Sequence, residues 1–166
     1  MKYDLSAFFA EQKKLDESIN KKHAVTYEDT IKERILAFLV ELGELCNETR
    51  CFKYWSLKGP SPKPVVLEEY IDGLHFIMSI GIYAKFANTD AINVFDFDEK
   101  LKLTDCLLDV YNLATDLIAD VNRANYYEVL THFLGLSVRL GFNYEDLKVG
   151  YEKKLAINYQ RQDNNY

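Results

Sequence analysis

The sequence predicts an all-α fold, a multi-helix bundle that forms one domain over residues 1–166. All three prolines lie within residues 60–64, so the residues that forbid helix are confined to one loop. Along most of the remaining chain, apolar residues recur at the three- and four-residue spacing of amphipathic helices, and no segment shows the alternation of a strand. The length suits one compact domain with a hydrophobic core and is too short for two ordinary domains.

Three helices are expected around the proline loop. The first covers residues from about 4 to 21. The second begins after Thr26, whose side-chain oxygen can cap it, and runs to about residue 48. The third follows the loop from about residue 66 to 87, and residues 88–90 end it with side chains that favour turns.

Three further helices are expected in the second half of the chain. Thr104 can cap the fourth, and apolar periodicity indicates the fifth over residues 126–140. Asn143 can cap the last helix, which covers about residues 144–159. The polar residues 160–165 follow it, and we expect them to be mobile until something orders them.

The charge balance excludes some classes of partner. The chain carries 20 Lys and Arg against 26 Asp and Glu, a net charge of −6. Such a charge repels nucleic-acid backbones and anionic membranes, so we expect neither a nucleic-acid polymer nor a membrane as a partner. A single nucleotide is compatible with it, because divalent cations can cancel the charges of phosphates and carboxylates together. The longest apolar stretch, residues 71–86, is interrupted by ionisable residues and falls short of the roughly 20 residues that span a bilayer.

The cysteines and the first residues indicate where the protein acts. Cys46, Cys51 and Cys106 form no C-x-x-C pair, so neither a disulfide framework nor a structural zinc site is indicated. The first residues lack the basic start, apolar run and cleavage site of a secretory signal. Both features favour the cytoplasm.

Two pairs of acidic residues are the strongest candidates for chemistry. Glu41 and Glu44 lie three residues apart on the second expected helix, so both carboxylates share one face. Glu69 and Asp72 repeat this spacing on the third helix. If the two helices pack antiparallel across the proline loop, the four carboxylates can converge.

The apolar surroundings of these pairs indicate that the carboxylates are partly buried. Like charges held together in a poorly hydrated site raise one another's pKa unless cations balance them, and oxygen ligands of high charge suit Mg²⁺ or Mn²⁺. Two such ions roughly 4 Å apart could clamp a phosphate chain and generate a hydroxide for attack on phosphorus. The alternative interpretation is a solvated acidic surface, because such pairs are common on exposed helix faces. Spacing and burial alone favour neither interpretation.

The motifs resemble those of a known family over most of the chain. E-x-x-E followed further along by E-x-x-D resembles the metal motif of the all-α nucleotide pyrophosphohydrolases, which include the MazG-like enzymes and the dimeric dUTPases. Within that group, residues 41–56 and 69–76 resemble the dimeric dUTPase signature. The end of the chain is similar to the C-terminal K…N…RQ…Y segment of that family. The resemblance implies the helical bundle of the all-α NTP pyrophosphohydrolases.

The resemblance implies a set of site residues. Glu41, Glu44, Glu69 and Asp72 would hold two or more Mg²⁺ ions, with Mn²⁺ a substitute, and either Glu41 or Glu44 would act in catalysis by orienting the attacking water. The implied substrate-binding residues are Gln12, Lys53, Trp55, His75, Lys154, Asn158, Arg161, Gln162 and Tyr166.

Four of these residues are expected at the nucleoside. His75 would lie beside the base or the sugar, and Asn158 could pair its donor and acceptor with the uracil edge. Trp55 could stack on the pyrimidine, although a lone Trp after a helix is as often a core anchor. Gln12 matches the glutamine of the Q-x-x-L-D stretch of the family and is expected to contact the base.

Four others are expected at the phosphates, and Gln162 has no more specific role than substrate binding. Lys53 and Lys154 would offer point charges to phosphate oxygens, and Arg161 a bidentate pair of donors. Tyr166 would close over the phosphates, so residues 160–166 are expected to form a closing segment.

The reaction that the resemblance implies is hydrolysis of dUTP to dUMP and pyrophosphate in a homodimer, with dUDP also accepted. Three alternatives remain open. The first is a related pyrophosphohydrolase that acts on dCTP or on several triphosphates. The second is a ferritin-like di-iron protein, which the sequence disfavours because such a site needs a ligand pair of this spacing on two helices and only Asp72 with His75 supplies one. The third is a helical binding module without catalysis.

Overall fold

The computed structural model describes residues 1–86 and 91–164, so the expected turn at residues 88–90 and the side chain of Tyr166 lie outside the described residues. The described part of the chain forms six helices and two very short strands, which confirms the expected all-α class. The elements are β1 (Lys2–Tyr3), α1 (Ser6–His23), α2 (Tyr27–Thr49), α3 (Lys63–Tyr83), β2 (Ile92–Asn93), α4 (Leu103–Ala119), α5 (Arg123–Arg139) and α6 (Tyr144–Asp163). Among the described helices, none combines the length and the apolar character that crossing a membrane requires.

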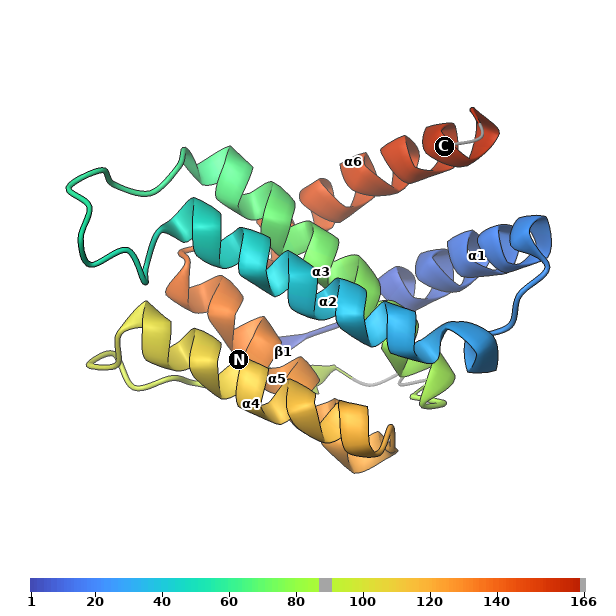
Figure 1. The fold of residues 1–166 in the computed structure, drawn as a ribbon, viewed down its shortest axis with the longest axis horizontal. Helices are drawn as coiled ribbons and strands as arrows, with labels where there is room; N and C mark the ends of the chain where they lie inside the picture. The colour runs from blue at the N-terminus through green and yellow to red at the C-terminus, as the bar shows by residue number, and fades with distance from the viewer. Residues whose placement is uncertain (87–90, 165–166) are drawn as a thin grey trace.

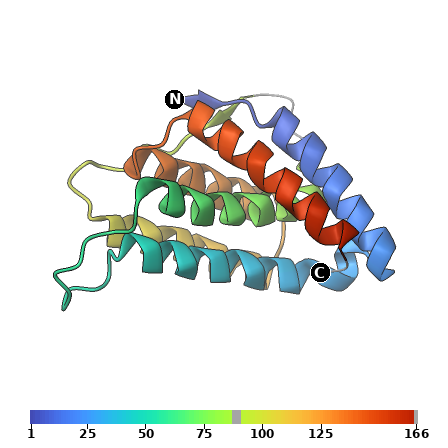
Figure 2. The ribbon, with the colours of Figure 1, turned by 90° about the horizontal axis from the view of Figure 1, so that it is seen from above.

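Helix α3 is the centre of the bundle. It packs against α1, α2, α5 and α6, while α4 packs against α2 and α5. Figures 1 and 2 show that α2 and α3 run side by side in opposite directions, joined by the long loop at one end of the molecule. The expected antiparallel packing across the proline loop is therefore confirmed.

The side chains of α3 explain its central place. The helix is apolar around most of its circumference, which is typical of a helix that other elements cover on several sides. Tyr70 stacks on Phe133 of α5 with ring centroids 4.5 Å apart, and its hydroxyl donates to the Phe133 carbonyl at 3.0 Å. The buried phenol thus keeps its hydrogen bond inside the core.

Two of the expected caps are confirmed. The Thr26 side chain accepts from the Asp29 amide at 3.2 Å, and the Asp29 carboxylate accepts from the Thr26 amide at 2.9 Å. Asn143 and Asp146 form the same reciprocal pair at the start of α6. Each capping box satisfies two amides that the helix leaves without partners.

The expected cap at Thr104 is wrong. Lys102 is the N-cap residue of α4, and Thr104 lies inside the first turn. Its hydroxyl donates instead to the Cys51 carbonyl at 3.0 Å, which ties α4 to the loop after α2.

The bounds of two helices and one pair of strands also differ from expectation. Helix α3 begins at Lys63, so Pro64, which was expected in the loop, lies in the first turn of the helix, where a proline costs no hydrogen bond. Helix α3 ends at Tyr83 rather than near residue 87, and Lys85 follows in the left-handed region at φ 54°. Helix α6 continues to Asp163, so residues 160–163 are helical. Strands β1 and β2 pair antiparallel over two residues each, which is too short for a visible alternation in the sequence.

Candidate active site

Three carboxylates meet between α2 and α3. Glu41, Glu69 and Asp72 each place one oxygen so that the three oxygens lie within 4.8 Å of one another. Gly73 of α3 lies beside this cluster, where a Cβ would make an ordinary 3.8 Å contact with the Cβ of Glu41 and would crowd Phe133 Cζ of α5 at 3.1 Å. The antiparallel packing of two acidic pairs thus produces the expected convergence for three of the four side chains.

The cluster raises the pKa values of its own members. Burial raises the pKa of Glu41 to about 7, and the charges of Asp72, Glu44 and Glu69 add to the effect. Burial likewise raises the pKa of Glu69 to about 7, with Glu44 and Asp72 contributing. The exposed Glu44 therefore acts on both neighbours electrostatically, although its own oxygens are outside the group of three. A set of hard oxygen ligands that repel one another fits a divalent cation.

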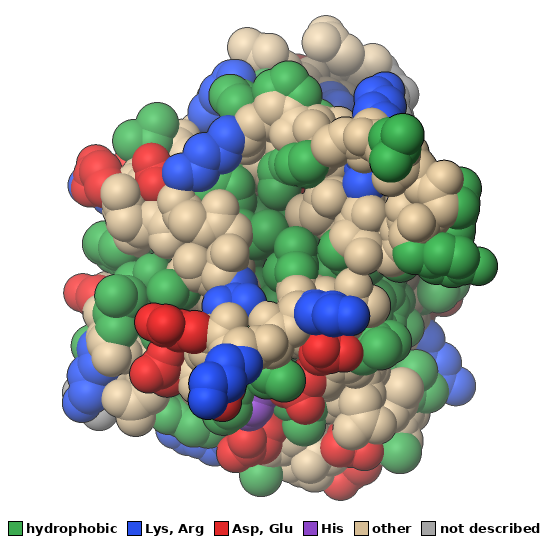
Figure 3. Space-filling view, turned by 90° about the vertical axis from the view of Figure 1, so that its left-hand side faces the viewer, with side chains coloured by type: hydrophobic (Ala, Val, Ile, Leu, Met, Phe, Trp, Pro, Cys, Tyr) green, Lys and Arg blue, Asp and Glu red, His purple; other side chains and the backbone are tan. Residues whose placement is uncertain are grey.

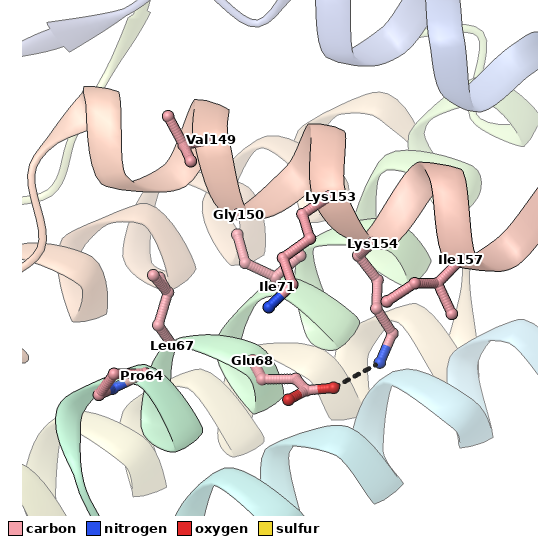
Figure 4. A pocket seen from close by; sticks show the side chains of 9 residues that line it. All are labelled: Pro64, Leu67, Glu68, Ile71, Val149, Gly150, Lys153, Lys154 and Ile157. Carbon is pink, nitrogen blue, oxygen red and sulfur yellow. Dashed lines mark hydrogen bonds and ion pairs between the residues drawn. The ribbon is translucent and has the colours of Figure 1, made fainter.

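A lysine from α6 partly balances this charge. Lys154 Nζ donates to Asp72 Oδ2 at 2.6 Å and to Glu68 Oε1 at 3.3 Å. Burial lowers the pKa of Lys154, but the hydrogen bonds and charges of Asp72 and Glu68 outweigh it, so the net pKa is raised. The pKa of Asp72 is raised by burial, and the Lys154 ammonium opposes that rise. Figure 4 shows Lys154 reaching from α6 across a groove to Glu68 on α3.

Beside the cluster lies a polar cavity of about 460 Å³. It is lined by α1, α2, α3 and α6. The expected site residues that it brings together are Gln12, Glu41, Asp72, His75, Lys154, Asn158, Arg161 and Gln162. Residues from both ends of the described chain thus share one cavity, and the positive charge of Arg161 acts on Asp72 by lowering its pKa.

Two of the expected site residues, Lys53 and Trp55, lie outside this cavity. Both belong to the loop between α2 and α3, and neither is among the described residues that line the cavity. Trp55 is 64% exposed and meets Tyr54 edge to face at a centroid distance of 5.0 Å, so it is not a core anchor. Figure 3 views the molecule from the side of this loop and shows hydrophobic side chains interspersed with separate basic and acidic ones.

The sequence interpretation missed a buried polar network at the wall of the cavity. Its centre is Asp16 of α1, which pairs with Arg34 at 3.2 Å and accepts from Ser79 at 2.6 Å and from Tyr27 at 3.1 Å. Asp16, Arg34 and Ser79 all line the cavity. A signal for Asp16 was present, because it is the aspartate of the Q-x-x-L-D stretch that begins at Gln12.

The helical bundle and its site define a class of protein. Clustered carboxylates beside a cavity with lysine and arginine side chains are suited to binding a phosphorylated ligand through divalent cations. In an all-α bundle, this combination is that of the helical hydrolases of nucleoside triphosphates.

Comparison with known families gives the particular member of that class. A family model described as dUTPase matches residues 4–166. The chain therefore belongs to the all-α dUTPase family and is an enzyme that hydrolyses dUTP. No curated protein matches the chain.

Proposed function

We propose that this dUTPase depends on Mg²⁺ and converts dUTP to dUMP and pyrophosphate at the cluster of Glu41, Glu69 and Asp72, and that it thereby controls dUTP levels. The observation that carries the proposal is the meeting of three carboxylate oxygens within 4.8 Å at the edge of a cavity that also contains Lys154 and Arg161. Opposite charges are thus arranged for a ligand that brings both phosphates and cations.

The ligands for Mg²⁺ would be Glu41, Glu44, Glu69 and Asp72. The fit rests on the donor set, which consists of hard oxygens. Burial and neighbouring carboxylates raise the pKa values of Glu41 and Glu69, so a cation that neutralises these charges would bind favourably. Two or more bound ions would neutralise phosphate charge and lower the pKa of water, and Mn²⁺ shares the same ligand preference.

The protein's own residues would orient water and phosphates. Glu41 or Glu44 would accept a hydrogen bond from the attacking water and direct its oxygen toward phosphorus. Lys154 and Arg161 would meet the phosphate oxygens from α6, and Lys53 would add a further positive charge from the α2–α3 loop. A substrate phosphate near Lys154 would compete with Asp72 and Glu68 for its ammonium group.

The nucleoside would occupy the part of the cavity lined by α1, α3 and α6. His75 and Asn158 would contact the base or sugar, and Gln12, which lines the same cavity, would contact the base. Gln162 would contact the substrate from the end of α6. Trp55 would contact the pyrimidine only if the exposed loop that carries it moves to the bound nucleoside. Tyr166 would close over the phosphates.

The enzyme would also accept dUDP and release phosphate, because the cluster and its cations would hold the phosphates whether two or three are present. We further propose that it acts in the cytoplasm, which is consistent with three free cysteines.

A substrate panel tests this proposal. Hydrolysis of dUTP, dUDP, dCTP, dTTP and UTP should be measured with Mg²⁺, with Mn²⁺ and with a chelator. We expect turnover of dUTP and dUDP with either metal and none with the chelator. Equal turnover of dCTP, or dUTP turnover that survives the chelator, would contradict the proposal.

We also propose that the enzyme is a homodimer. Helices α2 and α4 pack against each other, and each leaves large apolar side chains exposed, namely Leu36, Val40, Leu108 and Ile118. A groove lined by both helices runs beside Leu36 and Ile118. Contiguous exposed apolar surface is typical of a protein interface, and a second copy could cover it.

A further inference from the structure

His75 has one ring nitrogen that no described residue satisfies. The side chain is 5% exposed and lines the polar cavity, and its Nε2 has no hydrogen-bond partner among the described residues. Buried polar atoms normally have partners, so an atom of this kind at a cavity wall indicates a ligand contact. Whether Nε2 donates or accepts decides which ligand group fits it.

Asp16 determines which groups donate and which accept in the chain of hydrogen bonds that leads to His75. This carboxylate is 2% exposed, pairs with Arg34, and accepts hydrogen bonds at Oδ2 from Ser79 and Tyr27. Beside a guanidinium it offers acceptors only. The group that faces its other oxygen, Oδ1, must therefore be a donor.

That group is the amide nitrogen of Gln12, which lies 2.8 Å from Asp16 Oδ1. The carbonyl oxygen of Gln12 consequently faces the opposite way, where it accepts from the Tyr151 hydroxyl at 2.7 Å. His75 Nδ1 also lies 2.7 Å from this oxygen. Because a carbonyl oxygen only accepts, Nδ1 must carry a hydrogen.

The His75 ring is neutral. Burial lowers its pKa to about 3, and the nearby charge of Lys154 acts in the same direction. The ring also stacks on Tyr151 at a centroid distance of 4.1 Å, which fixes its plane. A neutral ring with hydrogen on Nδ1 has a lone pair on Nε2, so Nε2 can only accept.

We propose that Asp16 and Gln12 are positioning residues that hold His75 in its Nδ1–H tautomer, so that Nε2 accepts a hydrogen bond from a donor group of the bound nucleotide. The part that concerns the nucleotide rests on the proposed function. Two groups of a deoxyuridine nucleotide supply such a donor, the N3–H of uracil and the 3′-hydroxyl of the sugar. If the donor is N3–H, the contact also rejects cytosine, whose N3 is an acceptor, because two lone pairs would then face each other.

The tautomer can be observed directly in the metal-free wild-type protein. Long-range ¹H–¹⁵N spectra distinguish the two neutral tautomers from the imidazolium, and the signals of His75 are assigned by their loss in His75→Gln. We expect hydrogen on Nδ1 and none on Nε2 between about pH 5 and pH 8. Hydrogen on Nε2 anywhere in this range would overturn the proposal.

Asp16→Asn tests the positioning role. The amide oxygen of the new side chain stays with the donors Arg34, Ser79 and Tyr27, so its NH₂ group faces Gln12. The Gln12 amide must then rotate and present NH₂ to His75, which moves the ring hydrogen to Nε2. We expect the spectra to show this inverted tautomer, whereas Glu17→Gln, an exposed change on the same helix, leaves it unchanged. A wild-type tautomer in a folded Asp16→Asn would contradict the proposal, and an unfolded variant leaves the wild-type spectra as the deciding measurement.

Binding of monophosphates identifies the donor without any turnover. Calorimetry with Mg²⁺ should compare dUMP with N3-methyl-dUMP and with 2′,3′-dideoxyuridine monophosphate. We expect one of the two analogues to bind roughly ten- to a hundredfold more weakly than dUMP, because it leaves the buried acceptor unpaired. The group that this analogue lacks is then the donor to His75 Nε2. If both analogues bind as well as dUMP, the contact is wrong while the proposed function stands. If dUMP itself does not bind, the proposed function is in doubt, and the His75 spectra still test the tautomer.

Discussion

At the scale of single residues, the carboxylates between α2 and α3 are in conflict with their surroundings. Burial and mutual repulsion favour the protonated form of Glu41, whose pKa rises from 4.5 to about 7. Glu69 is raised to about 7 for the same reasons. A group whose folded-state pKa is raised stabilises the fold most below its unfolded pKa, and this contribution is lost as pH rises through the folded pKa. Without metal, the stability of the protein should therefore fall as the pH rises from 4.5 to about 7 and stay low above that pH.

Glu41→Gln tests this conclusion. The variant has no charge to lose or gain at position 41, so its melting temperature without metal should fall less than that of the wild type between about pH 5 and pH 7.5. Its Mg²⁺-dependent turnover should drop at least a hundredfold, roughly, because a ligand and a candidate for orienting water are lost. Glu28→Gln, an exposed change in the first turn of α2, should keep the wild-type pH dependence. Parallel stability curves for Glu41→Gln and the wild type would contradict the prediction.

Helical spacing and family resemblance were enough to predict the two acidic pairs, because both are local in sequence. The contacts of Asp72 with Lys154 and of Asp16 with Arg34 could not be predicted, since they join side chains that only tertiary packing brings together. Gln12 was expected at the base for its motif alone. The structure shows its amide engaged with protein groups on both sides.

At the scale of elements, the close approach of α6 to α3 positions Lys154. Gly150 makes the approach possible, because a Cβ there would lie 2.9 Å from Ile71 Cγ1. Ile71 is buried and branched, so it has little freedom to move away.

Gly150→Ala should consequently destabilise the protein, although alanine favours helix. The gain from helix propensity is about 1 kcal/mol, while overpacking costs about 1–3 kcal/mol, so we expect a net loss of about 1 kcal/mol in denaturant unfolding. The KM for dUTP should rise, because α6 moves with its Lys154. The matched change is Gly59→Ala, where the added carbon would meet no atom of the described residues within 4 Å apart from its chain neighbours, and this change should be neutral. If Gly150→Ala is more stable than the wild type, α6 can shift away from α3 at little cost and the prediction is wrong.

Helix positions were predicted well, and their ends less well, for reasons that lie in tertiary structure. Apolar periodicity continues past Tyr83 because Phe86 is buried, yet it is buried from a turn rather than from the helix. The polar end of α6 was expected to be mobile unless something ordered it. Lys22 at the end of α1 donates to the Gln162 carbonyl, a contact that no local pattern contains.

At the scale of the whole molecule, the exposed apolar side chains of α2 and α4 belong to the same helical bundle that builds the site. An isolated chain would leave Leu36, Leu108 and Ile118 each more than half exposed to water. Covering them by a second copy would link the stability of the active bundle to protein concentration.

Leu108→Glu should therefore shift the protein from dimer to monomer. A carboxylate buried within an apolar interface stays unpaired and costs several kcal/mol on association. Sedimentation equilibrium would show the change in mass. Val149→Glu introduces the same charge at an exposed apolar position of α6 and should remain dimeric. A monomeric wild type would refute the proposed interface.

The ion pair between α6 and α3 has a consequence for synthesis of the protein. A ribosome completes α3, with Glu69 and Asp72, long before it adds Lys154. A growing polypeptide whose α2 and α3 have already packed would hold its acidic centre without the ammonium group that later partly balances it, so cellular magnesium would be most valuable to the chain before translation ends.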